Sequence, residues 1–315
     1  MRATSFICVL LLSCFASFAQ EGFKVVPLGV KGGNIDGNMS AYMVAPAHSN
    51  DFVCFDGGSV SQGIEKAIAN GVFNVKPDVV LKKYLKAYLI SHPHLDHLSG
   101  MIINSIDDTV KNLYGFNTCM EVIKNHYFNW QSWPNMGSDG NAPALKKYKY
   151  NVLAEDAEIS VENTQMSMKA FKLSHSNPYE SAAFLVANNG DYVLYFGDTG
   201  PDEVEGTGRM KAVWQAVAPL VKAKKLKGIF LEVSYPNEQP DKKLYGHLTP
   251  KWFMKELSQL AELSGLENVK GLNVVVTHIK PAGNNEELIK KQLLAANTLG
   301  VNLIFTEQGV AFDLK

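Results

Sequence analysis

Short apolar runs alternate along the chain with longer stretches in which apolar residues recur at helical spacing. Short apolar runs bounded by turn residues predict strands, here at residues 23–28, 41–44, 52–55, 87–90, 168–171, 192–196, 228–231 and 274–276. The helical spacing predicts helices near residues 62–72, 97–106, 116–127, 209–221, 250–262 and 285–298. Strands and helices occur in both halves, so the pattern predicts a core of two sheets with helices outside them.

The first 19 residues have a different pattern from the rest of the chain. Arg2 precedes an apolar run at 6–12, and Ser17-Phe18-Ala19 places small residues just before Gln20. This order predicts a cleaved signal peptide over residues 1–19, and therefore export to a periplasm or beyond it. A second interpretation makes the segment a lipoprotein signal with an acylated Cys14. No linker divides residues 20–315, which we expect to form one domain.

Composition narrows the class of protein. Apolar residues make up 46% and charged residues 19% of the chain, an ordinary globular balance. Lys and Arg number 30 and Asp and Glu 31, so no strong positive field exists to bind a long nucleic acid. Two cysteines lie beyond the signal segment, Cys54 and Cys119, in apolar surroundings far apart in sequence. We expect two buried thiols in preference to one disulfide.

Polar residues that bind metals follow directly after several of the predicted strands. His92, Asp198 and His278 each come two residues after the end of a predicted strand, and His175 comes soon after the strand at 168–171, in a chain with only 8 histidines. Functional side chains gather in loops at strand ends because the sheet holds those loops in place. Four such residues in one chain form a pattern that predicts a shared site.

The segment His92-Pro93-His94-Leu95-Asp96-His97 carries the strongest chemical signal. Imidazole and carboxylate are ligands that Zn²⁺ prefers, usually three or four to an ion. So short a loop does not easily wrap four groups around one ion, which favours two adjacent ions, completed by the strand-end residues. The predicted ligands are His92, His94, Asp96, His97, His175, Asp198 and His278.

These residues resemble the signature of the metallo-β-lactamase fold, and the longer run from His92 to Ser105 resembles that of the class II cyclic-nucleotide phosphodiesterases within it. The likeness covers nearly the whole chain after the signal segment, at residues 37–42, 55–58, 133–135, 196–200, 232–237, 246–250 and 277–281. The resemblance implies an α/β (α+β) chain folded as an αββα sandwich, with two mixed sheets flanked by helices.

The resemblance also implies a reaction and its cofactors. Metal-dependent hydrolysis of 3′,5′-cyclic nucleotides, cyclic AMP and also cyclic GMP, would yield nucleoside 5′-monophosphates through a hydroxide bridging two Zn²⁺ ions, with Mn²⁺ or Fe²⁺ as alternative metals. The resemblance assigns His92, His94 and His175 to one ion, Asp96, His97 and His278 to the other, and Asp198 to both. Asp96 is also a candidate catalytic residue.

Two further residues are candidates for catalysis beside the metals. His247 lies in a Gly-His-Leu-Thr segment before a predicted helix, and Glu232 follows another strand. The pair resembles elements of the tRNA-processing nucleases of the same fold. We expect His247 to supply a proton or positive charge to the leaving oxygen, and Glu232 to orient the imidazole and raise its pKa.

The polar segment 129–148 is long for a connection that serves no site. We expect Trp133, or its neighbour Trp130, to stack on a purine, and Asn129 or Asn135 to hydrogen-bond the base or ribose. Packing of the two indoles onto the core is the alternative. The segment 56–58, Asp-Gly-Gly, is expected to hydrogen-bond the ligand imidazoles.

Three other functions are compatible with parts of the pattern. The same metal chemistry would hydrolyse a lactone, a β-lactam or another carbonyl compound, but the full-length likeness and the Glu232/His247 pair argue against this. Hydrolysis of RNA ends is disfavoured because no basic arm exists to hold a polyanion. A metal- or nucleotide-binding protein without activity would be expected to show a damaged ligand set, and here all seven positions are intact. The preferred partner is thus a small cyclic nucleotide. We expect no transmembrane segment, and the oligomeric state stays open.

Overall fold

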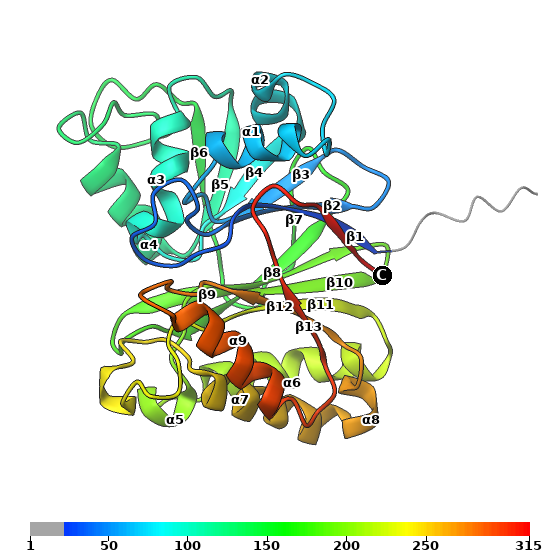
Figure 1. Ribbon diagram of the computed structural model, residues 1–315. Helices are drawn as coiled ribbons and strands as arrows, with labels where there is room; N and C mark the ends of the chain where they lie inside the picture. The colour runs from blue at the N-terminus through cyan, green and yellow to red at the C-terminus, as the bar shows by residue number, and fades with distance from the viewer. Residues whose placement is uncertain (1–21) are drawn as a thin grey trace, which may run out of the picture.

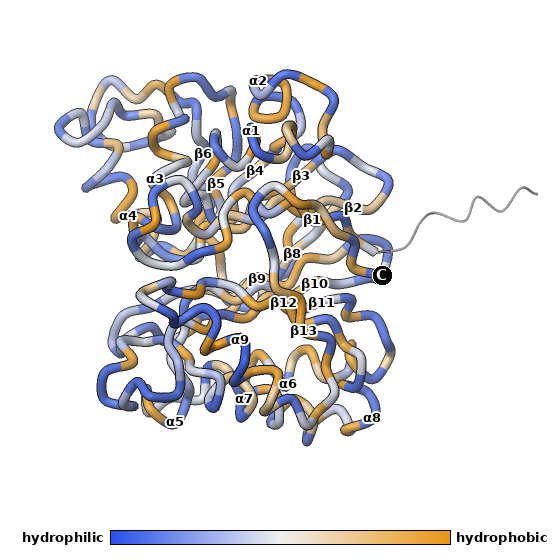
Figure 2. Tube along the Cα trace, in the orientation of Figure 1, coloured by the Kyte–Doolittle hydropathy of each residue, from blue (hydrophilic) through white to orange (hydrophobic). Residues whose placement is uncertain are grey.

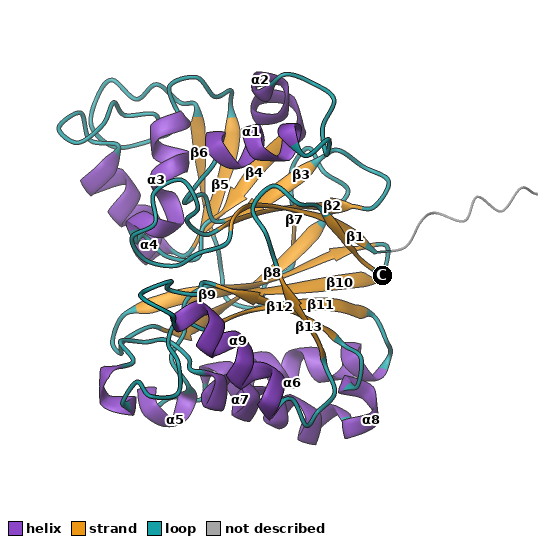
Figure 3. Cartoon of the chain, in the orientation of Figure 1, coloured by secondary structure: helices purple, strands orange, loops and turns teal. Residues whose placement is uncertain are grey.

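The computed structural model describes residues 22–315 (Figure 1), so the predicted signal peptide and Cys14 lie outside the described residues. Two seven-stranded sheets pack face to face, and helices cover the outer face of each (Figures 1 and 3). The expected αββα sandwich of mixed sheets is confirmed. Within the described part of the chain, no helix is both long and apolar enough to cross a membrane.

The first sheet has the strand order β14-β1-β2-β3-β4-β5-β6. Strands β3 to β6 run parallel, while β14, β1, β2 and β3 pair antiparallel. Its strands are β1 (Phe23–Gly29), β2 (Ala41–Pro46), β3 (Phe52–Phe55), β4 (Leu85–Leu89), β5 (Lys111–Gly115), β6 (Tyr148–Val152) and β14 (Phe312–Leu314). Its helices are α1 (Ser61–Ala69), α2 (Pro77–Val79), α3 (Leu95–Asn104) and α4 (Asn117–Val122), with π-helical turns at Val80–Tyr84 and Ile123–Tyr127.

The second sheet has the order β13-β12-β11-β10-β9-β8-β7. Strands β10 to β13 are parallel, and β7 to β10 pair antiparallel. Its strands are β7 (Ile159–Ser160), β8 (Ser167–Ser174), β9 (Glu180–Asn188), β10 (Asp191–Phe196), β11 (Leu226–Glu232), β12 (Asn273–Thr277) and β13 (Asn302–Phe305). The elements outside it are α5 (Asp202–Glu205), α6 (Arg209–Lys222), α7 (Pro250–Ser264), α8 (Leu266–Val269), α9 (Asn285–Ala296) and a 3₁₀ turn at Asp241–Lys243.

Apolar side chains fill three layers, one between the sheets and one beneath the helices on each side. Between the sheets, the ring of Phe55 stacks on Tyr195 with centroids 4.7 Å apart, and both lie within about 6 Å of Phe230. Figure 2 shows hydrophobic and hydrophilic residues alternating along the outer helices, as helices with one buried face require. Aromatic packing thus joins the two sheets directly.

All the predicted strands and helices form, but the structure contains further strands. β5 holds the polar pair Lys111 and Asn112, and Lys111 is buried only because its ammonium pairs with Asp108. β6 lies at the edge of its sheet and is correspondingly polar. β7, β9, β13 and β14 were also not predicted. Pairing with neighbouring strands, which a local pattern does not reveal, stabilises these segments.

Cys54 and Cys119 are both buried free thiols, as expected. Burial raises the pKa of both, because a thiolate loses its hydration in apolar surroundings.

Close backbone contact positions the first turn of α3. A Cβ atom at Gly58 would lie 2.0 Å from the carbonyl oxygen of Asp96, and one at Gly100 would lie 2.7 Å from the carbonyl oxygen of Gly58. Only glycine permits this approach at either position. The approach presses α3 against the end of β3 and so determines where Asp96 and His97 point.

Candidate metal centre

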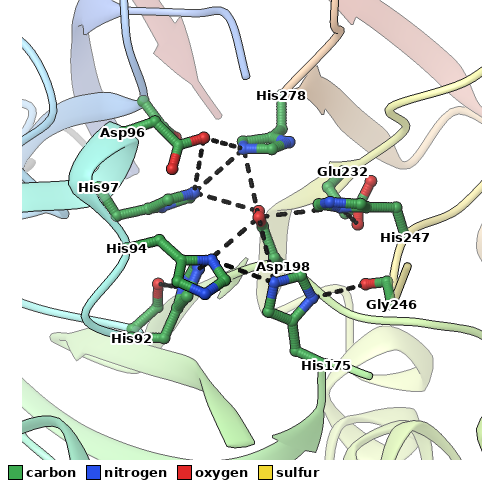
Figure 4. A network of polar contacts seen from close by, with 12 residues as sticks. His92, His94, Asp96, His97, His175, Asp198, Glu232, Gly246, His247 and His278 are labelled. Carbon is green, nitrogen blue, oxygen red and sulfur yellow. Dashed lines mark hydrogen bonds and ion pairs between the residues drawn. The ribbon is translucent and has the colours of Figure 1, made fainter. Parts of the chain in front are cut away.

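Seven side chains converge where the carboxyl ends of β4, β10 and β12 meet (Figure 4). They arise from five places in the chain: the loop after β4 carries His92 and His94, the first turn of α3 carries Asp96 and His97, and His175, Asp198 and His278 follow β8, β10 and β12. The structure therefore brings together every residue that the sequence predicts as a ligand. They form two groups that share Asp198.

The first group contains three imidazoles and the shared carboxylate: His92, His94, His175 and Asp198. The Nδ1 atom of His94 lies 3.0 Å from Nε2 of His92 and 3.3 Å from Nε2 of His175. Atom Oδ2 of Asp198 lies 3.7 Å from the His92 nitrogen and 3.9 Å from the His175 nitrogen.

The second group contains two imidazoles and two carboxylates: Asp96, His97, Asp198 and His278. Nε2 of His97 lies 3.0 Å from Nε2 of His278, which in turn lies 3.1 Å from Oδ2 of Asp96. The two oxygens of Asp198 lie 3.3 Å from these two imidazole nitrogens, one each. Asp96 is itself held by the backbone N–H of Gly33, which donates to its carboxylate at 2.8 Å.

Neighbouring groups occupy the outward-facing nitrogen of four of these imidazoles. Nδ1 of His92 contacts the Ser91 hydroxyl at 3.0 Å, and that of His278 contacts the Ser234 hydroxyl at 2.9 Å. Nδ1 of His175 donates to the Gly246 carbonyl at 2.8 Å. In each ring the Nε2 atom is left facing the centre, the arrangement by which proteins orient metal-binding histidines.

The fourth imidazole, His97, is oriented by Asp56. Its Nδ1 donates to Asp56 Oδ2 at 2.8 Å, and that oxygen also accepts from the Tyr195 hydroxyl at 2.6 Å. The other oxygen of Asp56 accepts from the backbone N–H of Ser91 at 2.7 Å. The 56–58 segment thus hydrogen-bonds a ligand imidazole as expected, with the carboxylate as acceptor.

The donor set fits divalent metal ions. Pairs of imidazole nitrogens face one another at about 3.0 Å, and Asp198 Oδ1 is buried without a hydrogen-bond partner. A buried oxygen of this kind is costly unless something pairs with it. Imidazole and carboxylate donors at these separations are the ligands that Zn²⁺ and similar cations prefer.

Charges within the two groups shift the pKa values strongly. Burial opposes ionisation of Asp198, but the imidazoles of His278, His97 and His247 outweigh it and hold its pKa well below the usual range. Burial also disfavours charge on His97, yet the carboxylates of Asp198 and Asp96 raise its pKa well above the ordinary value. The centre thus keeps negative charge on its carboxylates, which favours cation binding.

Glu232 and His247 lie directly beside the metal centre. Nδ1 of His247 donates to Glu232 Oε1 at 2.9 Å and lies 3.7 Å from Asp198. Glu232 therefore orients the ring as expected, but the expected rise in the pKa of His247 is wrong. Burial, together with the neighbouring Lys280 ammonium, holds that pKa well below its usual value. Burial and the Asp198 charge raise the pKa of Glu232 to about 8.

Lys280 is a site residue that the sequence reasoning missed. Its Nζ lies 2.8 Å from Nε2 of His247 and over the ring of Tyr235, 5.1 Å from the centroid. The signals for it were its position two residues after the ligand His278 and its place in the 277–281 segment of the family resemblance. Lys280 lines a cavity of about 380 Å³ with His94, Asp96, His175, Asp198 and His247. That volume suits a small molecule.

The predicted substrate residues of the 129–148 segment make contacts within the chain. The amide of Asn135 is buried and donates to the carbonyls of Asp139 and Asn141. Asn129 accepts hydrogen bonds from backbone N–H groups of its own turn. The Trp133 ring packs on the core beneath α3 and α4, and its N–H donates to Ser105. None of the three lines the cavity, and the substrate-binding roles of this segment stay predictions.

Comparison with solved structures agrees with the observed fold. The metallo-β-lactamase fold protein YhfI from Bacillus subtilis superposes with a TM-score of 0.61 at 16% identity, covering 93% of this chain and 100% of that one. Unliganded yeast PDE1 superposes with a TM-score of 0.83 at 23% identity, covering 93% and 99%. The sandwich and its donor groups define a protein of the metallo-β-lactamase fold class.

Sequence comparison identifies the family. The family model described as cAMP phosphodiesterases class-II matches residues 19–309. The chain is 44% identical to a 3′,5′-cyclic-nucleotide phosphodiesterase of Aliivibrio fischeri over 95% of both chains. It is 37% identical to a probable enzyme of the same name from Yersinia pestis, over 96% of this chain and 92% of that one. The chain belongs to the class II cyclic AMP phosphodiesterase family and is an enzyme.

The hydrogen bond from His97 to Asp56 predicts a measurable effect on metal binding. Asp56→Asn keeps the side-chain size but removes the carboxylate that orients His97. We expect a loss of about 10–100-fold in metal affinity, the usual consequence of removing such a partner. The measurement is competition with a chromophoric chelator. Asp51→Asn, at an ion pair with Lys86 on the surface, is the matched control. A folded Asp56→Asn protein with unchanged metal affinity would contradict this role for Asp56.

Proposed function

We propose that this enzyme hydrolyses 3′,5′-cyclic AMP and cyclic GMP to nucleoside 5′-monophosphates at a centre of two Zn²⁺ ions. The observation that carries the proposal is the sharing of Asp198 between two otherwise separate groups of donors. The substrate class is supported by the names of the relatives from Aliivibrio fischeri and Yersinia pestis, which match over almost the full chain.

In this proposal His92, His94 and His175 hold one ion, Asp96, His97 and His278 hold the other, and Asp198 contacts both. Two such ions, when bound, supply a hydroxide from water at neutral pH and neutralise the charge on the phosphate oxygens. In this proposal Asp96 serves catalysis by holding its ion in place.

His247 and Lys280 are placed to serve the substrate beside the metals. The Lys280 ammonium donates to Nε2 of His247, and Nδ1 of that ring donates to Glu232, so the ring is held at both nitrogens. Opening of the cyclic phosphate leaves charge on the 3′ oxygen, which needs a proton. We assign that proton transfer to His247, which receives the proton at Nε2 from the Lys280 ammonium and passes it to the 3′ oxygen, and electrostatic contact with the phosphate to Lys280.

The direct test is hydrolysis of cyclic AMP and cyclic GMP by purified protein, with products separated by chromatography. We expect 5′-monophosphates as the only products, loss of activity with a chelator and recovery on adding Zn²⁺. Asp198→Asn should lower activity roughly a thousandfold, because metal stabilisation of phosphoryl charge is worth several kcal/mol. A zinc-loaded protein that cleaves a lactone or β-lactam but neither cyclic nucleotide would contradict the proposed function.

A second substrate distinguishes the role of His247 from that of Lys280. His247→Ala should lower kcat for cyclic AMP by about 10²–10⁴-fold, the range for a lost general acid. It should affect bis(4-nitrophenyl) phosphate much less, since nitrophenolate leaves without a proton. Lys280→Met should slow both substrates, because both carry the phosphate charge. Equal losses on both substrates in His247→Ala would rule out the leaving-oxygen role.

Export is a separate proposal, supported by the order of charged, apolar and small residues over 1–19. Expression of the full chain in a Gram-negative host, followed by fractionation and N-terminal sequencing, should recover protein that begins at Gln20 outside the cytoplasm. A lipid-modified Cys14 in the membrane fraction would favour the lipoprotein alternative instead. Recovery of the uncleaved chain from the cytoplasm would contradict both.

A further inference from the structure

Two tyrosines on the wall of the metal cavity are unusually exposed. Tyr179 is 73% and Tyr245 is 62% accessible to solvent, and both line the same cavity as His94, His175 and Lys280. Aromatic side chains contribute to stability mainly by being buried, and these two are not. Among residues 22–315, neither phenol hydroxyl hydrogen-bonds another side chain. Folding of the chain therefore does not explain their position.

The turn that carries Tyr179 is tied to a metal ligand. The backbone N–H of His175 donates to the carbonyl of Tyr179 at 3.0 Å, and the N–H of Tyr179 donates to the carbonyl of Ser176 at 3.2 Å. The Glu205 carboxylate accepts from the N–H of Asn177 at 2.7 Å and from the Ser174 hydroxyl at 2.8 Å. The turn is thus held at both ends, and Tyr179 projects from a fixed base.

The turn that carries Tyr245 contacts the same ligand from the other side. The carbonyl of Gly246 accepts from Nδ1 of His175 at 2.8 Å. A Cβ atom at Gly246 would lie 2.3 Å from the backbone nitrogen of Ser176, so the two turns touch. Tyr245 itself has a φ of 52°, in the left-handed region that non-glycine residues rarely occupy. Such backbone strain is retained where surrounding contacts hold it, often at functional sites.

The chemistry of the cavity divides into two parts. The imidazoles, the carboxylates and Lys280 suit an anionic phosphate and the cations that bind it. The two phenol rings are the large apolar surfaces in the lining. A substrate with a phosphate at the metals would therefore place its non-phosphate part against these rings. Flat aromatic bases stack on tyrosine faces, and this contact tolerates different bases because each has a π-face.

We propose that Tyr179 and Tyr245 form a stacking site for the purine base of the substrate, an inference that rests on the proposed function. The rings bind the base by its faces, without reading its edge. The enzyme therefore accepts adenine and guanine alike, and binds the smaller pyrimidine cyclic nucleotides more weakly. These tyrosines are specificity-determining residues and take no part in the chemical step.

The test compares Tyr179→Ala and Tyr245→Ala with wild type on two substrates, cyclic AMP and a ribose 3′,5′-cyclic phosphate that lacks the base. Removing one stacked aromatic weakens base binding by roughly 5–150-fold. We expect KM for cyclic AMP to rise by about tenfold in each variant with kcat nearly unchanged. KM for the base-free substrate should not change. Tyr→Phe at either position should restore the KM for cyclic AMP.

A binding measurement provides a second readout that does not depend on turnover. By calorimetry, each alanine variant should weaken 5′-AMP binding by about the same factor and leave inorganic phosphate binding unchanged. Trp130→Ala is the matched control: this ring is also exposed, but it lies in the 129–148 segment and does not line the cavity. The control should leave both affinities unchanged.

Two results would overturn the stacking site. In the first, the alanine variants keep KM for cyclic AMP and affinity for 5′-AMP within twofold of wild type. In the second, activity falls equally on both substrates, which would mean that the tyrosines only support His175. Failure of wild-type protein to cleave cyclic AMP would refute the proposed function instead. The calorimetric comparison of 5′-AMP with phosphate would then decide the stacking site alone.

Discussion

The structure depends on the attraction between buried carboxylates, imidazoles and the cations that these groups bind. Asp198 lies between the two groups of donors, and its two oxygens reach nitrogens that belong to both. A buried carboxylate with an oxygen that accepts no hydrogen bond is costly by itself. The surrounding imidazoles offset part of that cost, and bound metal ions would offset the remainder. The backbone must therefore hold Asp198 and the imidazoles close together.

The scaffold meets this constraint through a second layer of hydrogen bonds. Ser91, Asp56, Gly246 and Ser234 each hold one imidazole by its outward nitrogen. Each of these partners lies at or near the carboxyl end of a strand or in a tight turn. The sheets therefore hold the partners, and through them the imidazole rings, in place. The contact of Gly58 and Gly100 does the same for α3 through backbone packing alone.

The cavity shows how one rigid centre serves different tasks. Its floor holds the metal donors, one side holds the Glu232–His247–Lys280 chain, and the rim holds the two exposed tyrosines. His175 connects these parts, because both tyrosine-bearing turns hydrogen-bond to it. A change in the rim can therefore alter substrate preference while the donors stay in place, provided that the hydrogen bonds to His175 survive.

The sequence by itself determined the ligands and the fold class. Histidine and aspartate immediately after apolar runs are a local signal, since a strand's end can be recognised from its own residues. All seven predicted ligands converge for that reason. The polar strands β5 and β6 left no comparable signal.

Only the tertiary structure decided which residues surround the ligands. Lys280 reaches His247 across 33 positions, and Asp56 reaches His97 across 41. Tyr179 and Tyr245 belong to turns that meet only when β8 and the segment before α7 lie side by side. Conversely, Trp133 and Asn135 are residue types suited to binding a nucleotide, but Trp133 packs on the core and Asn135 is hydrogen-bonded within its own loop. Composition shows which chemistry a segment can offer, whereas proximity arises only when distant strands pair and their loops reach the same edge of the sandwich.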